Sequence, residues 1–265
     1  MKRQLFSRPD LYIARTGDLR HSVVNVRIPD APAFMRGVKA VFISDTHIIP
    51  ATTDAHMQAL IERIEALEPD ILLMGGDYAD MRPDGERFFK HLARICAPLG
   101  KYAVIGNNDP EDWPDVESLA KAAAGGGVVL LVNDAGKIPV NGGELIVAGV
   151  DEHLRGAPET KGLYPEKRDD NTYRVLLSHY PCMPEVQPDL MLSGHTHGGQ
   201  FNCLGITPFT IGFERIMNRK ISSIATAGLH PLGNGWLFVG KGIGASRLQI
   251  RIGVRPEIYN IRFDC

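Results

Sequence analysis

Five short polar stretches contain the residue types that bind metal ions, and each comes directly after an apolar run. A lone histidine or an Asp-x-His triplet occurs by chance in many proteins, so most of these stretches are uninformative singly. His195 and His197 carry more weight, because extended backbone would point both side chains the same way and the neighbouring glycines leave room for a ligand. The five stretches are 44–47 (SDTH), 75–77 (GGD), 106–109 (GNND), 178–181 (SHYP) and 194–200 (GHTHGGQ).

Taken together, the five stretches predict a centre that holds two metal ions. Imidazole and carboxylate ligands suit Zn, Fe and Mn. A carboxylate such as Asp77 can bridge two ions about 3.5–4 Å apart, the spacing used in phosphoryl and related hydrolyses. The candidate ligands are Asp45, His47, Asp77, Asn107, His179, His195 and His197.

The elements that must position these residues alternate between short apolar strands and amphipathic helices, which indicates an α/β domain with parallel strands. Helical spacing of apolar residues predicts helices over 53–67, 84–95 and 114–124. In such sheets ligands bind at the carboxyl ends of the strands, which is where the polar stretches lie. The predicted strands are 22–28, 39–44, 70–74, 102–105, 128–132, 144–150, 173–177, 190–192, 236–239 and 258–263.

Length and composition predict one domain over residues 1–265, with an irregular N-terminal arm over 1–22. The formal net charge of -2, without a basic stripe, argues against a nucleic-acid partner. The chain shows neither a secretory signal nor an apolar stretch of about 18 residues, and its four cysteines are widely spaced, as reduced thiols would be. We therefore expect a cytoplasmic protein, with peripheral membrane contact as an open alternative.

The motifs resemble those of a known family, the calcineurin-like metallophosphoesterases. Asp45-x-His47, Gly76-Asp77, Gly106-Asn107, His179 and the GHTH of 194–197 occur in that family's order, and the stretch 240–258 is similar to one branch of bacterial phosphodiesterases. The resemblance implies a four-layer α/β/β/α sandwich in which two mixed sheets are flanked by helices.

The same resemblance implies a mechanism. A hydroxide held by two divalent ions, with Mn favoured over Fe or Zn, would attack the phosphorus of a phosphodiester or pyrophosphate. A related group in this branch hydrolyses UDP-2,3-diacylglucosamine, so a lipid-linked or nucleotide-sugar substrate is a finer expectation. The implied ligands are Asp45, His47 and His197 for one metal, Asn107, His179 and His195 for the other, and Asp77 as the bridge.

The sequence departs from the family at Asn108, where the family has a histidine that assists the leaving group. An asparagine can donate a hydrogen bond to phosphate but cannot act as a general acid, a role typically worth about 10²–10⁴-fold in rate. Three interpretations remain open: the substrate has a good leaving group, another group such as His153 supplies the proton, or catalysis is lost and a metal-binding interaction module remains. A phosphomonoesterase is a further alternative.

Two other features allow a functional and a structural interpretation. The apolar segment 201–217 could dock an acyl chain or a membrane surface, although packing against the domain is the simpler expectation. Arg247, Arg251 and Arg255 could face an anionic substrate, but we expect each of them at the surface.

Overall fold

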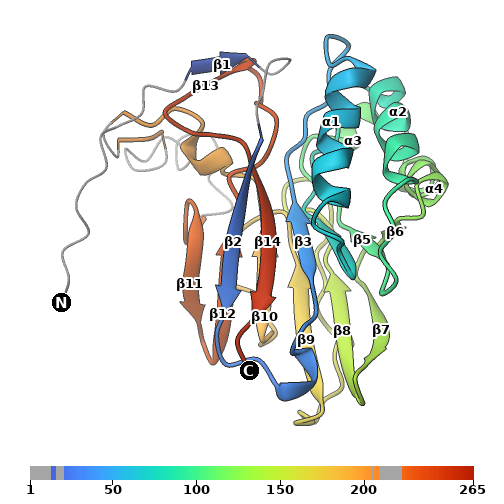
Figure 1. Ribbon diagram of the computed structural model, residues 1–265, viewed down its shortest axis with the longest axis vertical. Coiled ribbons are helices and arrows are strands. Elements are labelled where there is room, and N and C mark those ends of the chain that lie inside the picture. The colour runs from blue at the N-terminus through green and yellow to red at the C-terminus, as the bar shows by residue number, and fades with distance from the viewer. Residues whose placement is uncertain (1–12, 16–20, 204–205, 209–222) are drawn as a thin grey trace.

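In the computed structural model, which describes residues 13–15, 21–203, 206–208 and 223–265, two six-stranded sheets pack face to face (Figure 1). The first sheet is mixed, because β14 runs antiparallel to β3 while the remaining pairs run parallel. Its strands, in spatial order, are β2 (Ser22–Ile28), β14 (Glu257–Phe263), β3 (Ala40–Ile43), β4 (Ile71–Met74), β5 (Lys101–Ala103) and β6 (Val129–Leu130).

The second sheet is also mixed, with a parallel centre and an antiparallel strand at each edge. Its central strands are almost wholly apolar, as expected for strands buried on both faces. In spatial order the strands are β11 (Gly228–Leu232), β12 (Gly235–Val239), β10 (Leu190–Ser193), β9 (Thr172–Leu177), β8 (Gly143–Gly149) and β7 (Asp134–Val140).

Helices α1, α2 and α4 lie together on one side of the first sheet (Figure 1). The Thr53 side chain caps α1 by accepting a hydrogen bond from the His56 backbone N–H at 3.2 Å, and Asp115 caps α4 through the Ser118 N–H at 2.7 Å. The helices are α1 (Asp54–Glu65), α2 (Arg82–Leu92), α3 (Asp109–Asp112) and α4 (Val116–Gly125), with two short 3-10 helices, η2 (Ala33–Met35) and η3 (His197–Gly199).

The main core lies between the two sheets. Phe42 of β3 meets Phe238 of β12 edge to face, with ring centroids 6.4 Å apart, and Leu192 of β10 is fully buried in the same cluster. On the outer face of the second sheet, apolar cover comes from loop residues such as Leu163 and Val186. The observed architecture confirms the predicted class, an α/β fold with two mixed sheets and flanking helices.

Several elements carried no clear periodicity and were not predicted. The N-terminal arm is not irregular throughout, because Ile13–Arg15 forms strand β1 and pairs with β13 (Ile250–Ile252). Strands β7 and β11 were also missed, and both are edge strands with partly exposed side chains. Most of segment 201–217 lies outside the described residues. None of the helices described is long and apolar enough to cross a membrane.

The buried position of Leu192 gives a stability prediction. Leu192→Ala would leave a cavity between the two sheets and should lower the free energy of unfolding by about 2–5 kcal/mol. Urea denaturation followed by circular dichroism would measure the change. The same substitution at Leu248, whose side chain is 64% exposed, is the matched control and should change the free energy by less than about 0.5 kcal/mol. Equal effects at the two positions would contradict this description of the core.

Candidate metal centre

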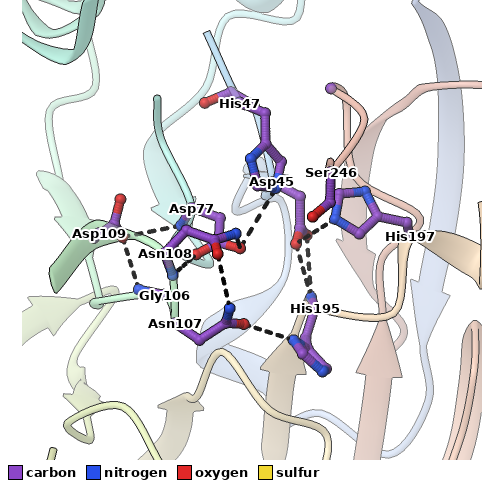
Figure 2. A network of polar contacts seen from close by, with 12 residues as sticks. Asp45, His47, Asp77, Gly106, Asn107, Asn108, Asp109, His195, His197 and Ser246 are labelled. Atoms are coloured by element: carbon purple, nitrogen blue, oxygen red, sulfur yellow. Dashed lines mark hydrogen bonds and ion pairs between the residues drawn. The ribbon is translucent and has the colours of Figure 1, made fainter. Parts of the chain in front are cut away.

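The carboxyl ends of parallel strands from both sheets meet at one place, and the predicted ligands lie there. Figure 2 shows side chains from separate segments pointing toward a common centre, with Asp77 in its middle. Asp45 and His47 follow β3, Asp77 follows β4, Asn107 follows β5, His179 follows β9, and His195 and His197 follow β10.

One group of donor atoms comes from Asp45, His47 and His197. Their ligand atoms all lie within 4.8 Å of one another, and all three residues are buried. His197 Nε2 is 3.5 Å from Asp45 Oδ1, and the rings of the two histidines lie 5.0 Å apart, centroid to centroid. Carboxylate and imidazole donors at this spacing could hold one metal ion.

A second group of donor atoms surrounds Asn107. Its Oδ1 lies 3.0 Å from His179 Nε2 and 2.8 Å from His195 Nδ1, so three potential ligand atoms meet at one point. Asp77 lies between this group and the first, because its Oδ2 is 3.4 Å from His47 Nε2 and 3.5 Å from His179 Nε2. The Asp77 carboxylate is therefore placed to serve both groups.

The backbone of these residues is strained. Asp45, His47, Asp77, His195 and His197 have φ values of 50°, 39°, 55°, 68° and 51°, in the left-handed region that side-chain-bearing residues rarely adopt. Such conformations persist only where the surroundings enforce them, and they gather at functional sites. The expectation of extended backbone at His195 and His197 is therefore wrong. A left-handed turn that leads into η3 orients these two side chains instead.

Two glycines allow the strand ends to approach this closely. A Cβ at Gly194 would collide with the Asp45 carboxylate, and a Cβ at Gly76 would collide with the backbone of Gly106. Gly76 also has a φ of 91°, which only glycine adopts at low cost. Both motif glycines are thus required by the packing of the site.

Neighbouring groups orient the histidine rings. The Asp80 carboxylate lies 2.8 Å from His47 Nδ1, and the Gly75 carbonyl lies 2.7 Å from His179 Nδ1. An acceptor at one ring nitrogen fixes the ring and leaves the other nitrogen for a metal. Among the described residues, the buried His47 Nε2 faces only the Asp77 carboxylate, with Oδ2 at 3.4 Å, which fits such a role. Asp80 was missed because nothing in its local sequence indicates that it reaches His47.

Asp109 holds together the backbone segments that carry Asp77 and Asn107. Its carboxylate accepts hydrogen bonds from the backbone N–H groups of Asp77 at 3.0 Å, Tyr78 at 3.0 Å and Gly106 at 2.7 Å. Burial, together with the nearby Asp77 charge, raises the pKa of Asp109 to about 7. This residue joins the ends of β4 and β5, a role that its position in the GNND motif did not reveal.

The electrostatics of the site favour cations. Burial raises the pKa of Asp45, whereas the pKa of Asp77 is held well below its usual value, because the His179 and His47 charges outweigh burial. Burial disfavours protonation of His47, yet Asp77 and Asp80 together raise its pKa to about 10. The charged Asp77 carboxylate thus draws positive charge into the centre, and a metal ion would compete with protons for these ligands.

The two predicted catalytic residues occupy different surroundings. Asn108 donates to both oxygens of Asp77, from its backbone N–H and from its side-chain Nδ2, each at 2.8 Å. His153 is half-buried instead of solvated, with Nε2 3.1 Å from Cys182 Sγ. Its ring packs near Tyr180, whose ring lies 3.9 Å from that of His195.

The surface placement expected for the three C-terminal arginines is wrong for Arg251. Its side chain is fully buried, and Nη2 lies 3.0 Å from His197 Nδ1. Arg247 and Arg255 are exposed, as expected. No strand was predicted around Arg251, and its local sequence does not show which segment its side chain packs against.

Comparison with known proteins identifies a family and several relatives that this chain resembles in sequence, and a solved structure that it resembles in fold. A family model described as calcineurin-like phosphoesterase matches residues 38–199. The chain is 28% identical to the uncharacterized metallophosphoesterase YkuE of Bacillus subtilis, over 90% of this chain and 82% of the relative. It is 29% identical to the phosphodiesterase YaeI of Escherichia coli, over 83% and 80% of the two chains. The fold resembles that of TT1561 of Thermus thermophilus, with a TM-score of 0.50 at 14% identity, covering 78% of this chain and 90% of that one.

The role of Asp109 can be tested by a conservative change. Asp109→Asn replaces one accepting oxygen by an N–H donor that would face backbone N–H groups, so we expect a loss of about 1–3 kcal/mol in the free energy of unfolding. Urea denaturation measures the loss. Asp115→Asn at the start of α4 is the matched control, because asparagine caps helices as well as aspartate does. An Asp109→Asn protein as stable as the control would refute the supporting role.

Proposed function

Because the chain belongs to the calcineurin-like phosphoesterase family, we propose that it hydrolyses a phosphodiester or pyrophosphate bond at a two-metal centre. The observation that carries the proposal is the position of Asp77 Oδ2, which lies within 3.5 Å of a histidine nitrogen from each of the two groups of donor atoms. A carboxylate so placed suits a bridge between two ions.

We assign the ligands as the family resemblance implies. The contacts around Asn107 and the group formed by Asp45, His47 and His197 support this division. Mn²⁺ is the first ion to test, because carboxylate and carbonyl oxygens suit Mn. The imidazole donors also suit Fe and Zn, which are the alternatives. The first metal would be held by Asp45, His47 and His197, the second by Asn107, His179 and His195, and both by Asp77.

The chemistry divides between the metals and the protein. When bound, a metal pair makes hydroxide available near neutral pH and neutralises charge on the phosphoryl oxygens. Asn108 orients the Asp77 carboxylate through its side-chain amide. Because an amide nitrogen carries two hydrogens, the second one can donate to a phosphoryl oxygen of the substrate.

The residues assigned to the site include no evident general acid to protonate the leaving group. Asn108 cannot supply a proton, and burial lowers the pKa of His153, which disfavours the protonated ring that a general acid needs. These observations favour a substrate whose leaving group departs as a stable anion, such as one side of a pyrophosphate. His153 is the second candidate for proton donor, and a nucleotide-sugar or lipid-linked diphosphate is the finer proposal for the substrate.

The first test is hydrolysis of bis(p-nitrophenyl) phosphate and of p-nitrophenyl phosphate with added Mn²⁺. We expect cleavage of the diester, loss of that cleavage on chelation, and at least about a 10³-fold lower rate in Asp77→Ala, because the change removes a ligand shared by both metals. Faster cleavage of the monoester would favour a phosphomonoesterase instead. If the protein binds two metals but cleaves neither ester, nor a nucleoside diphosphate sugar, the result would favour the non-catalytic interaction module.

Asn108→His tests the leaving-group argument. We expect it to raise the rate on diphenyl phosphate, a poor leaving-group substrate, by up to about 10²-fold, because a positioned acid contributes about that much. The rate on bis(p-nitrophenyl) phosphate should change little. The ratio of the two rates is the measured quantity.

His153→Ala is the companion variant for the same ratio. If the half-buried His153 ring takes no part in proton transfer, the ratio of the two rates stays at the parent value. A selective loss on diphenyl phosphate would identify His153 as the acid and contradict the leaving-group argument.

A further inference from the structure

The segment of residues 241–251, here called the C-terminal brace, follows β12 and lies outside the residues matched by the family model. It returns to the metal centre from the far end of the chain, ending in β13, which lies at the same end of the molecule as the carboxyl end of β3 (Figure 1). Each of the three ligands proposed for the first metal is held by this brace.

The brace holds Asp45 through its main chain. The backbone N–H of Gly244 donates to the Asp45 carbonyl at 2.6 Å, and that of Ile243 donates to the same carbonyl at 3.2 Å. A Cβ at Gly242 would press against Asp45 Cβ, so the two segments are in close contact. The left-handed conformation of Asp45 is thereby enforced from outside its own loop.

The brace holds His47 through an intermediate carboxylate. Gln249 Nε2 donates to Asp80 Oδ2 at 3.0 Å, and Asp80 Oδ1 lies 2.8 Å from His47 Nδ1. Gln249 therefore fixes the orientation of the group that orients the ring. Partners one step behind a ligand commonly matter for metal affinity.

The brace holds His197 directly. Arg251 Nη1 donates to the His197 carbonyl at 3.3 Å, which holds the main chain of the ligand residue, and Nη2 lies 3.0 Å from His197 Nδ1. The same guanidinium donates to the carbonyls of Lys241, at 2.8 Å, and Gly244, at 2.5 Å. A planar, fully buried fork that donates to three backbone carbonyls fixes the main chain of His197 against the brace more rigidly than a lysine could.

The ligands proposed for the second metal are held from other parts of the chain. Arg155 Nη1 donates to the Asn107 carbonyl at 2.7 Å, from the loop after β8, and the Gly75 carbonyl lies 2.7 Å from His179 Nδ1. The Tyr180 ring lies against that of His195. These contacts come from outside the brace, and the two groups of ligands are joined where the His195 backbone N–H donates to both Asp45 carboxylate oxygens, at 3.0 and 3.2 Å.

We infer that the C-terminal brace selectively secures the first metal, with Arg251 and Gln249 as its positioning residues. The inference rests on the proposed two-metal function, because it concerns the ligands assigned there. It predicts that damage to the brace weakens one metal and spares the other, whereas general destabilisation would weaken both.

The test is titration of the metal-free full-length protein with Mn²⁺ by calorimetry. In Arg251→Lys, which keeps the charge but loses the fork, and in Gln249→Ala, we expect one of the two Mn²⁺ ions to bind about 10–100-fold more weakly and the other to bind as in the parent. Electron paramagnetic resonance at one added ion per protein should show isolated Mn²⁺, and the signal of a coupled pair should require far more metal than in the parent. Arg247→Lys, an exposed arginine of the same brace, is the matched control and should behave as the parent.

Second substitutions identify the site that remains. Added to Arg251→Lys, His195→Ala should abolish the remaining tight site, whereas His47→Ala should not. Unchanged binding of both ions in Arg251→Lys and Gln249→Ala, or equal weakening of both ions, would overturn the inference while leaving the two-metal centre intact. A parent protein that does not bind two ions would instead overturn the proposed function and the inference with it. If Arg251→Lys does not fold, as judged by circular dichroism, Gln249→Ala decides the question.

Discussion

The burial of two carboxylates at the meeting point of the sheets is the constraint on which the rest of the site depends. Asp45 and Asp77 are almost completely removed from water, and a buried charge is costly unless it is paired. Histidine nitrogens from both sheets pair with the Asp77 carboxylate, since His47 Nε2 and His179 Nε2 lie within 3.5 Å of its Oδ2. Positive charge beside Asp77 lowers the cost of burying its carboxylate, and a divalent cation would supply such charge.

The sheets also explain how strained residues are maintained. Parallel strands end abruptly at the site, and the left-handed turns after β3, β4 and β10 direct ligands inward. Glycines at Gly76 and Gly194 let these turns come together, and Asp109 joins two of them through three backbone N–H groups. The large core between the sheets provides the rigidity that such conformations require.

The surroundings of the centre are asymmetric, and this asymmetry bears on function. Asn108 donates to the Asp77 carboxylate but has no acidic proton to transfer, so in the proposed reaction the leaving group would depart without help from this residue. Asp45, His47 and His197 are contacted from the C-terminal brace, whereas Asn107 and His179 are contacted from the loops after β8 and β4.

The sequence by itself determined the α/β class, most central strands and the candidate ligands, because each is encoded locally: an apolar run, then a short polar motif. The arrangement in two mixed sheets followed from the family resemblance, since the local pattern predicted parallel strands only. Only the tertiary structure decided which distant groups hold those ligands. Arg251 contacts a residue 54 positions away, and Gln249 and Asp80 are 169 positions apart. No local spacing or periodicity records such a contact. Edge strands β7 and β11 and the small β1–β13 pair escaped prediction for the same reason, since their pairing depends on partners elsewhere in the chain.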